Sequence, residues 1–190
     1  HFMKKYCQIQ HPTRGRIPFH LYPFQEKSLE SLADFDYKII LKSRQLGIST
    51  LSAGYSLWLM LFQEDKNVLV IATKQEVAKN LVTKVREMHN YLPSWLKGTT
   101  TEDNKLSLRF KNGSQIKAVS SSGDAGRSEA LSLLVIDEAA FIDKIDTIWA
   151  SAQQTLATGG KAIILSTPNG TGNFFHKTWV AAEESRNKFN

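Results

Sequence analysis

One ten-residue segment has the side chains and the spacing of a loop that binds phosphate. Residues 41–50 read LKSRQLGIST and lie between an apolar segment and an apolar, helix-like stretch. A phosphate loop needs inward-facing backbone N–H groups and a helix N-terminus that faces the anion, followed by a hydroxyl for Mg²⁺. Gly47 permits the required backbone shape, Ile48 opens the helix, and Ser49 occupies the Ser/Thr position of the G-x-x-x-x-G-K-[ST] pattern. The predicted nucleotide-binding residues of the loop are Lys42, Ser43, Arg44, Gln45, Leu46, Gly47, Ile48, Ser49 and Thr50.

This loop departs from the pattern at two positions. Lys42 stands in place of the first glycine, and Ile48 stands in place of the lysine. The first residue of a loop that curls around the β-phosphate also lies near the ligand, and the flexible stem of a lysine can bring its ammonium onto the phosphates. We therefore expect Lys42 to replace the missing lysine. Two alternatives remain: Lys42 lies in solvent at a site that binds nucleotide without hydrolysing it, or the segment is an ordinary strand-to-helix turn.

A pair of adjacent acids supplies the second half of a hydrolytic site. Asp137 and Glu138 follow the apolar run 133–136, which reads LLVI and is typical of a buried strand. Two carboxylates at a buried strand end are costly unless a cation or a substrate uses them. Asp137, with Ser49, is the predicted metal ligand, and Glu138 is the predicted base that polarises the attacking water. The alternative is a solvated strand end.

Two arginines are candidates for stabilising charge on a transferred phosphoryl group. Arg44 lies inside the loop, where it could contact the γ-phosphate, and Arg127 lies on a glycine-flanked segment before the acidic strand. Arg127 is better placed to reach a neighbouring subunit. A surface salt bridge is the alternative for both residues.

The elements that must position these groups form an α/β pattern. Short segments rich in Ile, Val and Leu are separated by helix-like stretches, as is typical of buried parallel strands. The strongest are 37–42, 67–72 and 131–136. Ligands of open α/β sheets bind outside the carboxyl ends of the strands, so the polar motifs should face one crevice. With 190 residues and 42% hydrophobic content, the chain is expected to form one domain.

Smaller signals refine this outline. The segments 106–110 and 115–119 flank an Asn112-Gly113 pair, which predicts a β-hairpin. Pro23 precedes a predicted helix at 24–33. The first 20 or so residues contain Gly and Pro breaks and are expected to lack regular structure.

Bulk composition narrows the classes of function. The net charge is +6 and is spread along the chain, so nucleic acid is a possible partner but a basic solvated surface explains the charge equally well. No apolar run approaches a membrane span, and the first residues lack the apolar run of a signal peptide. Cys7 is the single cysteine, so an internal disulfide is excluded and a reducing, intracellular compartment is expected.

Three motifs together carry a resemblance to a known family. Residues 43–47 (SRQLG), 135–141 (VIDEAAF) and 166–170 (STPNG) have the order and spacing of the large terminase subunits of tailed bacteriophages, over nearly the whole chain. The resemblance implies a P-loop NTPase of the additional-strand catalytic-glutamate class, with a mainly parallel central sheet flanked by helices. It implies ATP as substrate, Mg²⁺ as cofactor and packaging of double-stranded DNA into a procapsid. Residues 1–190 would be the ATPase domain without the family's nuclease domain.

The resemblance also implies partners and residue roles. The expected partners are a homo-oligomeric ring of this chain, a portal protein and a small terminase subunit, in the host cytoplasm and without a membrane. Asp137 and Glu138 match the Walker B pair, and Arg127 matches an arginine that acts in trans in some relatives. The matching coupling segment, which relays nucleotide state to domain motion, consists of Ser166, Thr167, Pro168, Asn169 and Gly170.

Residues 22–25 resemble an adenine-recognition segment, in which Gln25 reads the base and an aromatic ring packs on it. The alternative for Gln25 is an exposed helix residue. Some terminases also place the loop lysine at the position of Lys42. Two rival functions remain: a fragment of a superfamily-2-like helicase, which would need a second RecA-like domain, and a non-catalytic nucleotide- or DNA-binding module.

Overall fold

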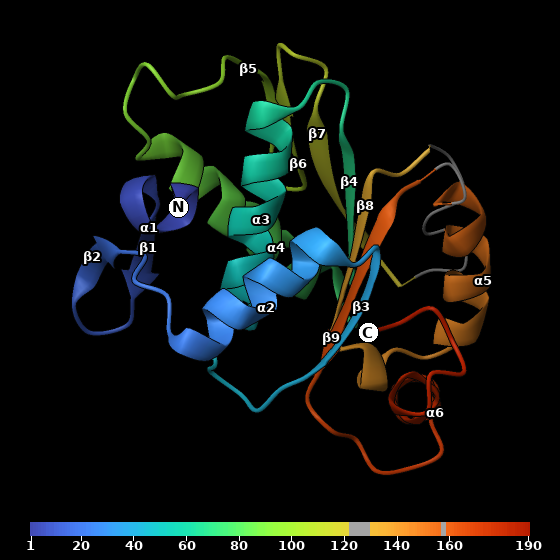
Figure 1. Cartoon of the computed structure of the whole chain (residues 1–190). Coiled ribbons are helices and arrows are strands. Elements are labelled where there is room, and N and C mark those ends of the chain that lie inside the picture. The colour runs from blue at the N-terminus through green and yellow to red at the C-terminus, as the bar shows by residue number, and fades with distance from the viewer. Residues whose placement is uncertain (122–129, 157–158) are drawn as a thin grey trace.

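A central sheet organises the computed structural model, which describes residues 1–121, 130–156 and 159–190 (Figure 1). The sheet has seven strands in the order β3-β9-β8-β4-β7-β6-β5 within these residues. Its strands are β3 (Tyr37–Leu41), β4 (Asn67–Ala72), β5 (Thr100–Asp103), β6 (Ser107–Phe110), β7 (Gln115–Ser120), β8 (Leu133–Asp137) and β9 (Lys161–Ser166). The predicted α/β class with a mainly parallel sheet is confirmed.

Five neighbouring strands run parallel to one another, namely β3, β9, β8, β4 and β7. Every residue of β8 is buried, because helices cover both faces of the sheet at its centre. The register pairs Leu41 with Ser166 and Asp137 with Leu165, so β3, β8 and β9 end at the same edge. The loops that carry the predicted site residues begin at this edge.

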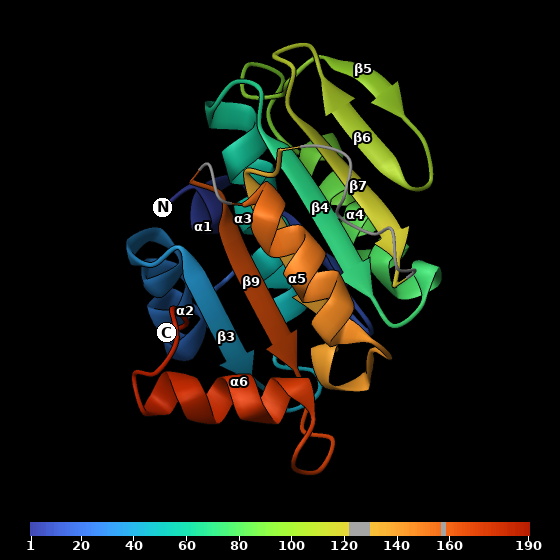
Figure 2. The ribbon, with the colours of Figure 1, turned by 90° about the vertical axis from the view of Figure 1, so that its right-hand side faces the viewer.

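Helices cover the two faces and enclose two apolar clusters. Figure 1 shows α2 (Pro23–Asp34), α3 (Ile48–Phe62) and α4 (Gln75–Asn90) on one face. Figure 2 shows α5 (Ile145–Thr155) and α6 (Phe174–Glu183) on the other, and the short helix η1 (Ala139–Phe141) follows β8. Most of α3 is buried, which matches its largely apolar sequence. None of the described helices is both long and apolar enough to cross a membrane.

The predicted hairpin is present as β6 and β7, which pair antiparallel. Its turn packs on the end of α3, where the Asn112 side-chain amide donates hydrogen bonds to the carbonyls of Met60 (2.8 Å) and Gln63 (3.1 Å). Carbonyls at the end of a helix lack partners within it, so these bonds satisfy the last turn of α3. Strand β5, which pairs with β6, was not predicted; all four of its residues are exposed, so it has no apolar alternation.

The expectation that the first 20 residues lack regular structure is wrong. They form helix α1 (Phe2–Tyr6) and a hairpin of β1 (Gln8–His11) and β2 (Gly15–Pro18). Gly15 turns the chain with a left-handed φ of 69°, which glycine adopts without steric cost. Met3 of α1 packs against Gly54 of α3, where any side chain would collide with its sulfur. Long-range packing on α3 thus orders a segment whose local sequence favours turns.

Candidate nucleotide-binding site

The predicted phosphate loop connects β3 to α3. Gln45 and Gly47 both have left-handed φ angles, 63° and 71°, and α3 begins at Ile48. Within the described part of the chain, the backbone N–H groups of residues 43–47 donate no hydrogen bond to another group. Unpaired N–H groups next to a helix N-terminus form a binding site for an anion. The loop therefore presents unpaired backbone donors of the kind that bind anions.

Lys42 lies between the two acids and not in solvent. Its ammonium donates a 2.6 Å hydrogen bond to Glu138 Oε1 and lies 3.8 Å from Asp137 Oδ1. Only 8% of its side chain is exposed. In this structure Lys42 is the cation that balances the acidic pair, which explains how two carboxylates are tolerated at the end of a buried strand.

Asp137 is the more buried of the two acids. Burial raises the pKa of its carboxyl group, and a hydrogen bond from the Ser49 hydroxyl and the charge of Lys42 offset only part of that rise. The Ser49 hydroxyl, in the first turn of α3, thus lies near enough to the Asp137 carboxylate, at the end of β8, to lower its pKa. These are the two oxygen donors predicted to hold a metal ion.

Both carboxylate oxygens of Glu138 have partners. Oε1 accepts the Lys42 hydrogen bond, and Oε2 accepts hydrogen bonds from the Thr167 backbone N–H (3.2 Å) and hydroxyl (3.0 Å). Burial by itself raises the pKa of Glu138, but the hydrogen bonds from Lys42 and Thr167 outweigh it and the pKa lies below its ordinary value. Glu138 is therefore ionised at neutral pH. It has a left-handed φ of 55°, which is unusual for a residue with a side chain.

The segment 166–170 lies beside the acidic pair. The Ser166 hydroxyl accepts a hydrogen bond from the Ala140 N–H, and its carbonyl accepts one from the Lys42 N–H. The Asn169 side-chain amide donates to the Ala140 carbonyl at 2.9 Å. Ser166 and Thr167 are buried, whereas residues 168–170 are exposed. Because Thr167 bonds Glu138, a shift of this acid would be transmitted directly to the segment.

Gln25 is buried, so the alternative of an exposed helix residue is wrong. Its carbonyl oxygen accepts a hydrogen bond from the Tyr22 N–H at 3.1 Å, and its amide nitrogen donates to the Leu46 carbonyl at 2.8 Å. Gln25 thus ties the start of α2 to the phosphate loop. The rings of Tyr22 and Phe24 stack beside it, with centroids 5.8 Å apart, and both are exposed.

Other predicted residues lie farther from this cluster. Ile48 is buried in the core and presents no polar group to the loop. Arg44 is exposed and makes no hydrogen bond or ion pair with the described residues. Arg127 lies outside the described residues. The remaining residues of the loop, Ser43, Gln45, Leu46 and Thr50, are exposed or half-buried.

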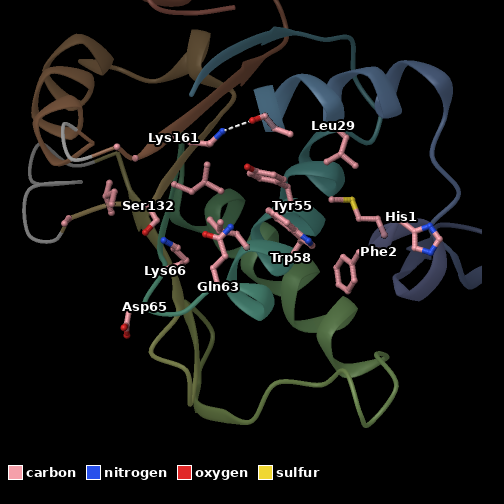
Figure 3. Close-up of a pocket in the computed structure, with 18 residues that line it drawn as sticks. His1, Phe2, Leu29, Tyr55, Trp58, Gln63, Asp65, Lys66, Ser132 and Lys161 are labelled. Atoms are coloured by element: carbon pink, nitrogen blue, oxygen red, sulfur yellow. Dashed lines mark hydrogen bonds between the residues drawn. The ribbon is translucent and has the colours of Figure 1, made fainter. Parts of the chain in front are cut away.

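Sequence reasoning missed two contacts, Thr167 to Glu138 and Gln25 to Leu46. Both join residues far apart in the chain, and no local pattern signals either one. A cavity of about 620 Å³ is elsewhere: it lies between α1, α2, α3 and the amino ends of β8 and β9 (Figure 3). Its lining, which includes Tyr55 and Trp58, shares no residue with the phosphate loop or the acidic pair.

Known proteins share this sequence pattern and this fold. The sequence pattern of the family "Terminase large subunit, T4likevirus-type, N-terminal" matches residues 39–189. The large terminase of bacteriophage HK97 is 21% identical, with a TM-score of 0.77 over 99% of this chain and 41% of its own. A large terminase from a thermophilic bacteriophage, in complex with ADP, is 17% identical, with a TM-score of 0.69 over 90% of this chain and 44% of its own.

A mutant ATPase domain of the large terminase of Thermus phage P74-26 is 20% identical, with a TM-score of 0.68 over 84% of this chain and 69% of its own. At these identities the likeness is one of fold. The chain spans less than half the length of the HK97 protein and of the ADP-bound terminase.

Proposed function

The chain belongs to the N-terminal family of T4-like large terminase subunits, and on that premise we propose that it hydrolyses ATP to drive double-stranded DNA into a procapsid. One observation carries the proposal: Lys42, Ser49, Asp137 and Glu138 converge at one edge of the sheet, beside a loop with unpaired N–H groups. The terminase from a thermophilic bacteriophage, which shares this fold, was solved with ADP, and this supports a nucleotide site. The family match favours this function over a helicase fragment.

The donor set fits Mg²⁺. Magnesium prefers oxygen ligands and in nucleotide sites usually takes one or two carboxylates together with phosphate oxygens and water. The Ser49 hydroxyl and the Asp137 carboxylate are such donors and lie near each other. Among the described residues there is no cluster of three acidic, His or Cys side chains, as a metal cage built from protein alone would need. When bound, Mg²⁺ neutralises charge on the β- and γ-phosphate oxygens.

Lys42 takes the role of the loop lysine, whose usual position is occupied by Ile48. Its backbone N–H is fixed by the Ser166 carbonyl at 3.0 Å, while its four-carbon side chain can swing. We expect the ammonium to leave Glu138 and contact the phosphates when nucleotide binds. This exchange replaces one anionic partner of the ammonium with another.

Glu138 is the proposed base. Release of Lys42 frees one carboxylate oxygen to accept a proton from the attacking water, while Thr167 holds the other oxygen and fixes the orientation of the carboxylate. Because Thr167 belongs to the segment 166–170, a change at Glu138 pulls directly on the proposed coupling segment. Thr167 is thus a positioning residue.

The remaining roles extend the proposal to the assembly. Gln25 and an aromatic ring of residues 22–24 are proposed to bind adenine, and Arg44 or Arg127 is proposed to stabilise the transferred phosphoryl group. The proposed partners are double-stranded DNA, a ring of identical subunits, a portal protein and a small terminase subunit, on the procapsid in the host cytoplasm. Residues 1–190 are proposed to act as a single ATPase domain.

Replacing Glu138 by Gln tests the proposal. The variant should bind a fluorescent ATP analogue with an affinity close to that of the unmodified protein, but its turnover should fall at least about 100-fold, because it lacks the proton acceptor. Glu183→Gln, on the exposed end of α6, is the matched control and should keep full turnover. A protein that binds the analogue but shows no turnover even before substitution would instead be the non-catalytic binding module.

A further inference from the structure

The N-terminal segment carries most of the net charge. Its first 25 residues contain four basic side chains and no acidic one, so they supply +4 of the total of +6. The segment 91–97, which follows α4, adds Lys97 and also lacks acids. Basic residues occur along the whole chain, as expected, but the N-terminal segment lacks the acids that balance them elsewhere. We call Lys5, Arg14, Arg16 and Lys97, with the elements that carry them, the N-terminal basic surface.

Aromatic contacts join these elements into one surface. The Arg16 guanidinium of β2 lies 3.2 Å from the centroid of the Tyr91 ring, which connects the hairpin to the segment after α4. The Tyr6 ring of α1 packs edge-on against Trp95 at 5.5 Å, and the Lys5 ammonium lies 5.4 Å from the Tyr6 centroid. The rings thus restrict the positions of the basic groups. Figure 1 shows α1 and the hairpin together on the same side of the sheet as α3 and α4.

The basic groups of this surface are available to a ligand. Lys5, Arg14, Arg16 and Lys97 are exposed, and none forms an ion pair with the described residues. Lys4, by contrast, is paired with Glu26 and belongs to the margin of the surface. The acid that faces the hairpin is Glu87 of α4, which is half-buried and shares a small hollow with Lys84.

We propose that the N-terminal basic surface binds the phosphate backbone of double-stranded DNA. Exposed basic groups without acidic partners complement a polyanion. Duplex fits better than a single strand, because a single-strand site needs free aromatic faces for successive bases. Here Arg16 covers one face of Tyr91, and Tyr6 contacts both Lys5 and Trp95. Of these three rings only Trp95 is mostly exposed (71%), and one free ring does not stack a succession of bases. This contact surface is separate from the nucleotide site and does not depend on hydrolysis.

A double charge reversal, Lys5→Glu with Arg14→Glu, tests the proposal. Neither side chain belongs to the nucleotide site, so ATP turnover without DNA should be unchanged. Binding of a labelled duplex of arbitrary sequence, followed by fluorescence anisotropy, should weaken at least about tenfold. The slope of log affinity against log salt should become shallower by roughly 2, since each lost phosphate contact removes about 0.9.

The matched control is Lys177→Glu with Lys188→Glu. It replaces two exposed lysines, one in and one shortly after α6, the helix that covers the opposite face of the sheet (Figure 2), and it changes the net charge equally. It should change duplex affinity less than about twofold. Equal losses of duplex affinity in the test and control variants would show that only the total charge matters. An unchanged affinity in the Lys5→Glu, Arg14→Glu variant would show that DNA binds elsewhere. Either result overturns the proposal. Tighter binding of a single strand at this surface would overturn the assignment to duplex. Circular dichroism checks that the variants are folded. The milder pair Lys5→Gln with Arg14→Gln removes the two charges without reversing them and repeats the test if the first variant does not fold.

Discussion

At the scale of single residues, the position of Lys42 decides which group contacts the acidic pair, Asp137 and Glu138, without nucleotide. Lys42 starts the loop at the end of β3, next to β9 and one strand away from β8, and its ammonium bonds Glu138 at 2.6 Å. Position 48, where the common pattern has its lysine, carries an isoleucine buried in the core. In the proposed function, the same ammonium contacts the acidic pair before nucleotide binds and the phosphates afterwards.

Replacing Lys42 by Met should open the acidic pair to free metal ions. Two unit charges about 4 Å apart near a surface interact by several kcal/mol, so removing the ammonium should raise the affinity for Mn²⁺ in the absence of nucleotide at least about tenfold. Electron paramagnetic resonance of free Mn²⁺ measures this affinity. The same variant should bind ATP more weakly, because it has lost its phosphate contact.

Lys42→Arg is the control, because it keeps the positive charge and should still exclude Mn²⁺ in the absence of nucleotide. If the Met variant binds the metal no better than the unmodified protein, then Lys42 does not compete with cations for Asp137 and Glu138.

Sequence indicates the chemical groups of the site better than their contacts. Ser49, Asp137 and Glu138 could be singled out because their roles follow from adjacency to a strand or a helix start. The bond from Thr167 to Glu138 spans 29 residues of chain and that from Gln25 to Leu46 spans 21. These contacts depend on which strands become neighbours, and short-range patterns carry no such information. Arg127 stays a prediction, since it lies outside the described residues.

At the scale of elements, the start of α2 supports the phosphate loop through Gln25. A side chain at Gly47 would place its Cβ 2.7 Å from the Gln25 amide nitrogen, and Gly47 has a φ of 71°. The left-handed conformation costs a residue with a side chain roughly 1–2 kcal/mol. The loop thus requires glycine for two reasons, backbone conformation and the close approach of Gln25.

Gly47→Ala should therefore lower the free energy of unfolding by about 1–2 kcal/mol and weaken nucleotide binding. Part of the loss should come from displacement of Gln25. Gln25→Ala should consequently cost less stability in the Gly47→Ala background than alone, which urea denaturation of the four proteins in a double-mutant cycle measures. Strictly additive losses would mean that Gln25 and Gly47 act independently.

Helix α1 and its end at Cys7 provide a chemical test of the ordered N-terminus. Burial raises the pKa of the Cys7 thiol from 9.0 to about 12. The native protein should resist a thiol-specific reagent at pH 8 and react readily once unfolded, since the thiolate is the reactive form. Because the folded pKa is the higher one, this thiol's contribution to stability is full below pH 9 and is lost as the pH rises to about 12.

The pH dependence of unfolding should therefore be shallower between pH 9 and 12 in Cys7→Ala than in the unmodified protein. Fast labelling of native Cys7 would contradict the docking of α1 on α3.

Elements with strong apolar periodicity were predictable from sequence, and elements held by distant packing were not. The helix predicted to open at Ile48 and the strand predicted at 67–72 match the structure, because both segments are strongly apolar. Strand β5 and the β1–β2 hairpin have few buried residues of their own. They form because they pack against a neighbouring strand or α4. The sequence of one segment does not identify such a partner.

At the scale of the whole molecule, one chain brings together most of the groups of the proposed hydrolytic site. Lys42, Ser49, Asp137 and Glu138 come together within the chain, but the side chain of Arg44 makes no hydrogen bond or ion pair among the described residues. A guanidinium from a neighbouring subunit would complete the site in a head-to-tail ring. The isolated chain should therefore hydrolyse ATP weakly, and the rate per subunit should rise with protein concentration. Vigorous hydrolysis that is independent of concentration would contradict a guanidinium in trans.

Mixing two inactive variants identifies which arginine acts and from which subunit. Glu138→Gln keeps Arg127 but lacks the base, and Arg127→Gln keeps the base but lacks that guanidinium. If Arg127 acts in trans, a random equal mixture should recover roughly one quarter of the full rate at high concentration, because about one quarter of head-to-tail contacts combine an intact base with an intact arginine. If Arg127 acts in cis, the mixture stays inactive, since no subunit holds both groups. If Arg127→Gln alone keeps full activity, Arg127 has no role in hydrolysis and Arg44 becomes the candidate. A mixture of Glu138→Gln with Arg44→Gln then decides whether Arg44 acts in cis or in trans.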